Sequence, residues 1–439
     1  MTSAKQATAP ATRLPAAYWR LWSASTISNL GDGIFLVALP LLAAQLTTNA
    51  ISISLVATFA GLPWLVLSLP IGAIIDRLDR RRLLVQADAF RTVLVGILAV
   101  LVAGGHARIW MLWLLAAGLG TAEVVFDNAS QAILPAIVAP HQLEKANGLR
   151  YSAEVTANIF VGTPIGSVLF TLAVWLPFAA DSASFLLAVM LVATLRGSFK
   201  VGQVRPTASL SRDVRTGLSW LWKHRLLRGL AVALGITNFG FQMSQGVFVL
   251  FAKERLHITD TQFGLMLSAI GVGAIIGGLV GDRIVARLGK LAVLYSAVVV
   301  WALALVAVGL WPVAWFVTVV SAIEALAATV WNVVTVSLRQ QIVPEALFGR
   351  VNSVYRWFGW GTIPIGAIAG GQVAHLYGLR APYFVGAGFV LLAMIVLMRT
   401  VTPKSLASSL SAAESDQAPS SPDSDTTPVY LERDPMLWE

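Results

Sequence analysis

Long apolar runs recur along the first 400 residues of this chain, and they constrain its fold more than any other feature. A helix needs about 20 apolar residues to cross the hydrocarbon of a bilayer. Twelve segments approach or exceed that length: residues 18–46, 51–75, 83–104, 109–138, 143–171, 174–196, 226–252, 260–281, 290–311, 313–338, 345–377 and 381–400. The sequence therefore predicts an all-α polytopic membrane protein with 12 transmembrane helices.

Composition agrees with that class of protein. The 439 residues are 57% hydrophobic and only 12% charged, whereas a soluble protein carries about 25% charged residues. The apolar runs are continuous, and the strands of a transmembrane barrel would alternate apolar and polar residues instead. The sequence has no cysteine, no phosphate-binding loop and no metal-ligand spacing. We therefore expect no enzyme activity, no metal and no cofactor.

The positions of the basic residues predict the orientation in the membrane. All but four of the 31 lysines and arginines fall on one side of the predicted spans, the exceptions being Arg108, Lys253, Arg255 and Arg380. Because cytoplasmic loops are enriched in lysine and arginine, we expect a cell-membrane protein with both termini in the cytoplasm. This topology also explains the net charge of +9, so no nucleic-acid partner is expected.

Polar stretches divide the chain into parts. Residues 197–225 begin polar and continue as an amphipathic helix, in which Leu210, Val214, Leu218 and Leu221 recur at helical spacing. We expect a cytoplasmic linker there. It separates a six-helix half at 18–196 from another at 226–400, and residues 1–17 form a cytoplasmic N-terminal segment. Residues 401–439 are rich in Ser, Pro, Ala, Asp and Thr, which predicts a disordered acidic tail.

The two halves repeat each other in sequence. Residues 122–127 (AEVVFD) align with 327–332 (AATVWN), and 131–135 (QAILP) align with 340–344 (QQIVP). A charged motif recurs as well: Gly72, Asp76 and Arg77 in GAIIDRLDRRR correspond to Gly278, Asp282 and Arg283 in GLVGDRIVARL. A duplicated six-helix unit is typical of transporters whose halves rock about a site near the bilayer midplane.

The first charged motif resembles a conserved loop of the major facilitator superfamily. The family pattern is G-x-x-x-D-R-x-G-R-R/K, and residues 72–82 match it except at Asp79, where the family usually has glycine. Three further stretches are similar to the branch that contains enterobactin and macrolide exporters: LGDGIFLVALP at 30–40, PFAADSASFLL at 177–187 and VPEALFGRVNSV at 343–354. The resemblance implies a monomeric secondary transporter whose partners are a small-molecule substrate, protons and membrane lipids.

The resemblance also implies a cytoplasmic gate. In the family, the loop Asp binds the N-terminal end of a helix in the opposite half, where the helix dipole stabilises a carboxylate. Asp76 would then meet the segment near Phe348 and Arg350, and Asp282 would meet the segment near Leu143. The gate would comprise Gly72, Asp76, Arg77, Arg80, Arg81, Gly278, Asp282 and Arg283. The alternative is that this basic loop only marks the cytoplasmic side.

Ionisable residues inside the first six predicted spans are candidates for proton coupling, because a charge at the bilayer centre costs at least about 2.5 kcal/mol. Asp32 lies near mid-depth, although a structural aspartate is the alternative. Glu123, Asp127 and Gln131 share a helix face, and two carboxylates one turn apart in a low dielectric resist ionising together. Many relatives carry an arginine in this fourth span. Here no lysine or arginine occurs between Arg108 and Lys145, so the helix supplies no basic partner of its own.

The fifth and sixth spans add further polar groups. Arg150, Glu154 and Asn158 form a stripe at i, i+4 and i+8, for which an intrahelical ion pair is the alternative interpretation. The segment GTPIG at 162–166 resembles a Gly-Pro motif of family antiporters and favours export. We expect Asp181, near the outer end of the sixth span, to be structural.

In the second half, Asn238, Gln242 and Gln245 share one face of the seventh span, and Glu324 lies near mid-depth of the tenth. Interhelical hydrogen bonding is the alternative role for these amides. We expect the proton-coupling groups to be Asp32, Glu123, Asp127, Glu154 and Glu324. We expect the substrate cavity to include Asn29, Asn158, Asn238, Gln242, Gln245, Asn332, Arg356, Trp357 and Trp360.

Together with the resemblance, these residues predict a secondary active transporter. The expected function is proton-coupled efflux, by alternating access, of a small amphipathic compound such as a drug or a siderophore. A proton-coupled nutrient importer, a lysophospholipid flippase and a non-transporting membrane sensor or scaffold remain as alternatives.

Overall fold

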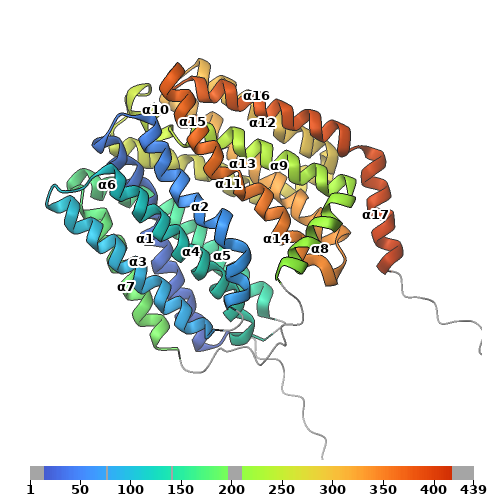
Figure 1. The fold of residues 1–439 in the computed structure, drawn as a ribbon, viewed down its shortest axis with the longest axis horizontal. Helices are drawn as coiled ribbons and strands as arrows, with labels where there is room; N and C mark the ends of the chain where they lie inside the picture. The colour runs from blue at the N-terminus through green and yellow to red at the C-terminus, as the bar shows by residue number, and fades with distance from the viewer. Residues whose placement is uncertain (1–13, 76–77, 140–141, 196–209, 418–439) are drawn as a thin grey trace, which may run out of the picture.

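A computed structural model describes residues 14–75, 78–139, 142–195 and 210–417, which are almost entirely helical (Figure 1). The first half contains α1 (Ala16–Leu46), α2 (Ala50–Ile75), α3 (Arg80–Ala103), α4 (Ile109–Ile137), α5 (Leu143–Val155), the π-helical segment η2 (Thr156–Gly162), α6 (Thr163–Leu172) and α7 (Leu176–Ala193). The linker contributes α8 (Leu210–Lys223). The predicted all-α class is confirmed.

The second half has the same organisation. It contains α9 (Arg225–Gln245), α10 (Phe248–Glu254), α11 (Asp260–Leu288), α12 (Lys290–Leu310), α13 (Ala314–Ile342), α14 (Glu345–Gly361), α15 (Ile363–Tyr377) and α16 (Ala381–Thr400), and α17 (Pro403–Gln417) follows it. Eleven spans in the described part of the chain are long and apolar enough to cross a membrane. The eleventh predicted span, 345–377, is not among them, because it is divided at Thr362 into α14 and α15, which have 17 and 15 residues.

Proline and glycine account for the interruptions within three spans. Pro164 has no N–H and its ring displaces the carbonyl one turn earlier, so the chain before it widens into η2. The Thr163 hydroxyl donates to the Ile159 carbonyl over 2.6 Å at this point. In the second half, α9 and α10 separate at Gly246, where a Cβ atom would lie 3.1 Å from the Ala367 backbone. Pro364 follows the break between α14 and α15 in the same way.

The charged motif of the second half lies inside a helix rather than at the end of a span. The predicted span 260–281 is too short, because α11 continues to Leu288 and carries Asp282 and Arg283 in its last turns. It ends where Gly289 adopts a φ of 81°, a left-handed conformation that favours glycine.

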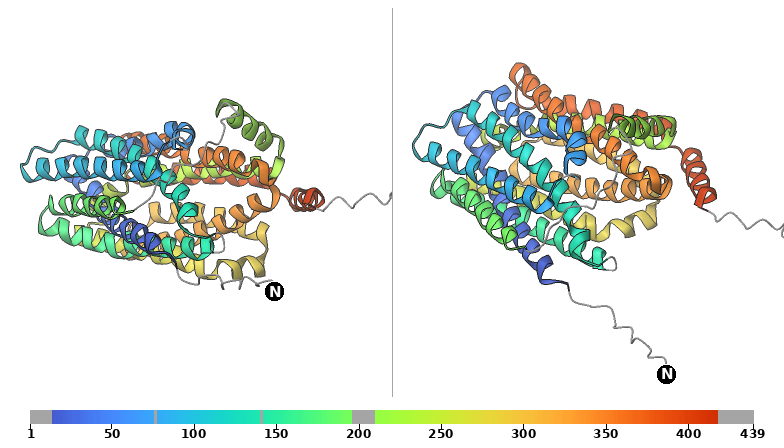
Figure 2. Two further views of the ribbon diagram at one scale, coloured as in Figure 1. Left: turned by 90° about the horizontal axis from the view of Figure 1, so that it is seen from below. Right: turned by 60° about the horizontal axis from the view of Figure 1, so that its bottom comes forward.

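Each half is a separate helical bundle. In the first, α1 packs on α7, α2 on α4, and α3 on both α4 and α7. In the second, α11 packs on α13, α9 on α15 and α16, and α12 on α13 and α16. The two bundles lie side by side with their helices roughly aligned (Figures 1 and 2).

The bundles meet through α2 with α14 and α15, and through α6 with α11. Hydroxyl groups make several of these contacts. Thr58 donates to the Pro364 carbonyl over 3.2 Å, the hydroxyls of Thr163 and Ser268 lie 2.6 Å apart, and those of Thr171 and Thr261 lie 3.1 Å apart. The end of the molecule with α6 and α10 is hereafter the distal end, and the end with α8 is the linker end (Figure 1).

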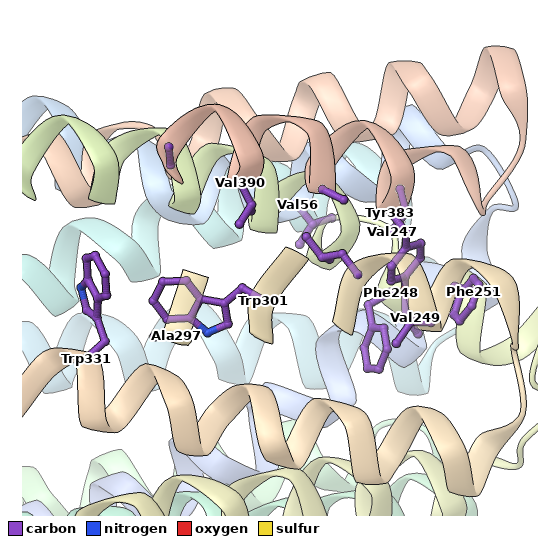
Figure 3. Close-up of a cluster of buried hydrophobic side chains, with 14 of the residues drawn as sticks. Val56, Val247, Phe248, Val249, Phe251, Ala297, Trp301, Trp331, Tyr383 and Val390 are labelled. Carbon is purple, nitrogen blue, oxygen red and sulfur yellow. The ribbon is translucent and has the colours of Figure 1, made fainter. Parts of the chain in front are cut away.

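A buried apolar cluster holds the second bundle together and reaches the first (Figure 3). Phe251 lies 4.6 Å from the ring of Tyr383, and Trp301 lies 5.3 Å from the ring of Trp331, measured between centroids. Val56 of α2 belongs to the same cluster. This packing fixes Trp301 and Phe248 beside the cavities described below.

The linker contains the predicted amphipathic helix. Leu221 of α8 is buried. Helix α8 also packs closely on α14, as Gly217 shows: a Cβ atom there would lie only 2.6 Å from the Arg350 carbonyl oxygen. Residues 196–209 of the linker lie outside the described part of the chain, as does most of the N-terminal segment 1–17.

The prediction of a disordered tail is wrong for its first part. Residues 403–417 form α17, which contacts α9 and α13 and packs Leu406 and Leu410 against the apolar core. The hydroxyl of Ser405 accepts from the Thr402 N–H over 2.9 Å near the start of this helix. The spacing of the two leucines is the signal that the composition argument overlooked. Residues 418–439 lie outside the described part of the chain.

Asp79, the departure from the family pattern, has a clear structural role. It is the N-cap of α3, and its carboxylate accepts hydrogen bonds from the backbone N–H groups of Arg81 and Arg82 over 3.0 and 3.2 Å. These donors have no partner within the helix, and an aspartate at this position satisfies them. A glycine would leave them to water.

We expect Asp79→Ala to lower the free energy of unfolding by about 1 kcal/mol and Asp79→Gly to lower it by only a few tenths. The measurement is SDS titration of the purified protein followed by tryptophan fluorescence. Asp79→Asn keeps an acceptor oxygen and should remain near wild type. Equal stability of the alanine variant and the wild type would contradict the capping role.

Candidate functional site

A cavity of 630 Å³ lies between the two halves. Its volume is within the range of about 300–1,000 Å³ that is usual for pockets binding small molecules. Helices α1, α2, α4, α5 and η2 form most of the wall, and α9, α10, α11 and α14 close it from the second half. The polar part of the wall consists of Ser25, Asn29, Asp32, Arg91, Glu123, Asp127, Arg150, Glu154, Asn158, Asp181 and Gln245.

Asp32 reaches this cavity because the glycines on either side of it let α1 pack very closely. A Cβ atom at Gly31 would lie 2.4 Å from a carboxylate oxygen of Asp181 on α7. A Cβ atom at Gly33 would lie 2.0 Å from the Asn158 carbonyl in η2. The helix is thus pressed against α7 and η2, and Asp32 is left partly exposed on the cavity wall. Asp181 is itself buried and lines the same cavity.

Sequence reasoning did not single out Arg91 of α3, which lines the central cavity. Only 4% of its surface is exposed, and its guanidinium lies 3.7 Å from the buried carboxylate of Asp88. The guanidinium also lies 5.1 and 5.3 Å from the ring centroids of Phe126 and Phe185, which favours cation–π contact. It interacts electrostatically with Asp32, Asp88, Glu123 and Asp127.

The basic partner of the α4 carboxylates therefore comes from a neighbouring helix. The observation that α4 contains no arginine is correct, but α3 supplies the charge instead. The signal was available in the sequence, because the predicted span 83–104 contains both Asp88 and Arg91, and ionisable residues inside a span are functional candidates.

Glu123 and Asp127 both face the cavity from α4, as their helical spacing predicted. Trp64 of α2 lines the cavity together with Glu123 and lies near its carboxylate. Asp127 lies within the electrostatic influence of Arg91, Arg150 and Arg356. The side chain of Gln131, the third member of that stripe, lies outside the described part of the structure.

Three predicted residues of α5 and η2 also line the cavity. Arg150 donates to the hydroxyl of Ser130 on α4 over 3.1 Å, so its described hydrogen bond joins two helices rather than closing a pair within α5. Glu154 lies within its electrostatic influence, and Asn158 lies one turn further on. On α1, Asn29 donates to the Ser25 carbonyl over 2.7 Å and lines the cavity beside Asp32.

The predicted amides of the second half lie in different places. Gln245 lines the central cavity, whereas Asn238 donates to the Gly359 carbonyl over 2.8 Å and lines a second cavity with Glu324. Gln242 packs where a Cβ atom at Gly366 would lie, and Asn332 is exposed on α13. Neither Gln242 nor Asn332 lines the central cavity or this second cavity.

The side chains of the predicted tryptophans, which belong to the second half, contact residues of the first half. Trp360 of α14 lies 5.0 Å from the Trp64 ring centroid of α2, and Arg356 lies 5.7 Å from the Trp360 centroid. Trp357 donates to the Leu65 carbonyl over 3.1 Å. Trp360 lines the central cavity. Arg356, Trp357 and Trp360 together line a smaller cavity of 80 Å³ beside it.

The predicted gate is only partly described. Asp76 and Arg77 lie outside the described residues, and the surroundings of Gly72 are not described. Arg81 donates to the Ala193 carbonyl, which joins the start of α3 to the end of α7, and Arg80 also stands in the first turn of α3. In the second half, Asp282 and Arg283 are exposed on α11 close to Gly278. Within the described residues no hydrogen bond or ion pair joins Asp282 to α5.

No group of three or more His, Asp or Glu in the described part of the chain is placed to hold a metal ion. The polar groups of the site are instead carboxylates, guanidinium groups and amides around a central space between two helical bundles. This arrangement defines a membrane transporter.

Comparison with known proteins gives the particular family. The chain belongs to the major facilitator superfamily, in the family described as transmembrane secretion effector, whose model matches residues 7–431. Multidrug efflux pump Tap of Mycolicibacterium fortuitum is 28% identical over 380 residues, which cover 82% of this chain and 90% of the relative. Macrolide efflux protein A of Streptococcus pyogenes is 22% identical over 388 residues, covering 86% and 94%.

Solved structures share the fold. A crystal structure of a variant of the nucleoside transporter NupG matches with a TM-score of 0.73 at 14% identity, covering 88% of this chain and all of that one. A bacterial homologue of the iron transporter ferroportin, in its inward-facing state, matches with a TM-score of 0.65 at 16% identity, covering 88% and 98%. These structures show the shared fold, and the family model confirms the predicted superfamily.

The buried position of Arg91 generates a test of its pairing with Asp88. Removing one partner of a buried ion pair costs about 3–5 kcal/mol, because the other charge stays buried without compensation. We expect Arg91→Gln to unfold at a clearly lower temperature than the wild type. The double variant Asp88→Asn, Arg91→Gln should recover much of the loss. Thermal unfolding in detergent measures both, and a double variant no more stable than the single one would contradict the pairing.

Proposed function

We propose that this protein is a proton-driven exporter of small amphipathic compounds, of the kind represented by drugs and siderophores. The observation that carries the proposal is the convergence of Asp32, Glu123 and Asp127 around Arg91 on the wall of one central cavity. A cavity of this volume accommodates a small molecule, and the carboxylates beside it can bind protons. The names of the two relatives described above, a multidrug efflux pump and a macrolide efflux protein, support export.

The proposed coupling rests on the charge balance around Arg91. A single guanidinium cannot neutralise all the carboxylates near it, so some of them must bind protons or contact a cation when the cavity is dry. Protonation of Asp32 or Glu123 weakens the attraction of Arg91 for that residue. Since α1 carries Asp32 and α4 carries Glu123, proton binding changes the forces between the helices that form the cavity.

Trp64 offers a path from this charge cluster to the other half. It lies near Glu123 on one side and contacts the tilted ring of Trp360 of α14 on the other. In our proposal, protonation of Glu123 releases Trp64 and loosens the contact between α2 and α14. Trp64 and Trp360 also line the central cavity, so a bound substrate acts on the same contact.

The contacts between the halves support a conformation that is closed at the distal end, where the three hydroxyl-mediated contacts lie. With both termini in the cytoplasm, as the basic residues favour, the distal end faces outward. The described structure then represents a state in which substrate enters from the cytoplasm. The exposed position of Asp282 agrees with an open gate, and we propose that Asp76 and Asp282 engage their partner helices when the transporter faces outward.

Asp32→Asn tests the coupling. We expect cells of an efflux-deficient host that express the wild type to accumulate less radiolabelled erythromycin and less ethidium than cells with empty vector. The asparagine variant should accumulate as much as the vector control, because it cannot exchange a proton at this position. Collapse of the proton gradient with an uncoupler should have the same effect on the wild type.

Glu254→Gln is the matched control, since Glu254 is an exposed carboxylate at the end of α10 and outside the cavity. Full export by Asp32→Asn would overturn the assignment of Asp32. Greater accumulation in cells with the wild type than in cells with the vector would indicate import and overturn the proposed direction.

A further inference from the structure

A second cavity lies within the second half of the molecule. It has a volume of 240 Å³, and helices α9, α11, α12, α13 and α16 enclose it. Its polar groups are Thr237, Asn238, Gln245, Ser321 and Glu324, and the rest of the wall is aliphatic except for the rings of Phe241, Phe248 and Trp301. It adjoins the central cavity, because Gln245, Phe248 and Leu267 line both.

Glu324 is the one acidic residue in the wall of this cavity, and it is almost completely buried, with 8% of its surface exposed. Its Oε1 atom is buried and has no hydrogen-bond partner among the described residues. The wall contains no lysine, arginine or histidine. This differs from the central cavity, where Arg91 and Arg150 lie among the carboxylates of the first half.

The residues that line this cavity around Glu324 carry no charge, and several of them are aromatic. The Trp301 indole of α12 donates to the Glu324 backbone carbonyl over 3.3 Å, which holds the ring beside the carboxylate-bearing turn of α13. Tyr383 of α16 interacts electrostatically with Glu324, and its buried hydroxyl has no hydrogen-bond partner among the described residues. A buried carboxylate in such a place is costly unless it binds a proton or a cation.

We propose that the second cavity is a subsite for the ammonium group of amine-bearing amphipathic compounds, and that Glu324 binds this group. The ammonium group donates hydrogen bonds to the unpartnered carboxylate, and the Trp301 side chain lines the same cavity. The inference rests on the proposed function, because the body of the same molecule occupies the central cavity. It names the chemical class of compound that the transporter prefers.

The size of the second cavity supports a subsite rather than a separate site. Pockets for whole ligands measure about 300–1,000 Å³, and 240 Å³ is below that range. A compound therefore places one group here, while the shared wall at Gln245, Phe248 and Leu267 lets the remainder lie in the larger cavity.

The site also predicts competition between protons and amines. A protonated Glu324 carries no charge to attract an ammonium group, so amine binding should weaken as the pH falls. Among the groups that face Glu324 from α9, α11, α12 and α16, only the Tyr383 hydroxyl is titratable, and it is neutral at these pH values. No charged side chain of the cavity wall masks the effect.

Two matched fluorescent probes test the proposal on the full-length protein in lipid nanodiscs, without a proton gradient. Monodansylcadaverine carries a primary amine at the end of a five-carbon chain, and its N-acetyl derivative has the same chain without the charge. At pH 8 we expect Glu324→Gln to weaken binding of the amine at least tenfold. Binding of the acetylated probe should change less than twofold, and Glu254→Gln should change neither.

A selective loss of amine binding supports the subsite, and the retained acetylated probe shows that the variant is folded. Unchanged amine binding, or equal losses for both probes, would overturn it. Because no transport is measured, a failure of export by the wild type would affect the proposed function and leave this result intact.

A second measurement needs no variant. Dicyclohexylcarbodiimide modifies protonated carboxyl groups in apolar surroundings, and mass spectrometry locates the modified residue. We expect the N,N-dimethyl derivative of monodansylcadaverine, whose tertiary amine cannot form an amide with the activated carboxyl group, to protect Glu324 of the wild-type protein from modification, and the acetylated probe to give little protection. Modification of Glu324 at the same rate with and without the amine would overturn the proposal.

Discussion

The first half of this transporter depends on the electrostatic interaction between the buried guanidinium of Arg91 and the carboxylates around it. Carboxylates from α1, α3 and α4 surround it, and each would be costly so deep in the protein without a cation nearby. Phe126 and Phe185 hold the guanidinium plane in place. The glycines beside Asp32 matter for the same reason, because they let α1 approach α7 and η2 closely enough to bring Asp32 into the cluster. The charge balance around Arg91 therefore depends on how closely the helices pack. Protonation of one carboxylate would change the electrostatic forces between Arg91 and several helices.

The internal repeat preserves the fold but divides the chemistry between the halves. In the aligned segments 122–127 and 327–332, the positions of Glu123 and Asp127 are taken by Ala328 and Asn332. The second half instead carries a single buried carboxylate, Glu324, one turn before Ala328 on the wall of its own cavity. Among the described residues, the wall of the central cavity thus holds several carboxylates with two arginines, and the wall of the second cavity holds one carboxylate and no basic residue. Such a division suits a transporter that must handle protons and a substrate through one continuous space.

The contacts between the halves differ along the length of the molecule. At the distal end they involve small hydroxyl side chains, such as Thr163 and Ser268, which allow the backbones to approach closely. Nearer the linker end they involve Trp64, Trp357 and Trp360, whose rings and N–H groups can change partners. Because Trp64 also approaches Glu123, the aromatic contact is linked to the charge cluster.

By itself, the sequence determined the properties that depend on local spacing: the helical spans, the duplicated halves, the amphipathic linker helix and the carboxylates that share a face of α4. It also pointed to Asp32, since an aspartate at mid-depth of an apolar span needs a polar environment. Only the tertiary structure decided which of these groups meet. It brought Arg91 to the α4 carboxylates, turned Gln242 and Asn332 away from the cavities, gave Asp79 a capping role and packed α17 against the bundle. The physical reason is that periodicity fixes the face of each helix, whereas the partner of that face is chosen by packing between segments far apart in the chain.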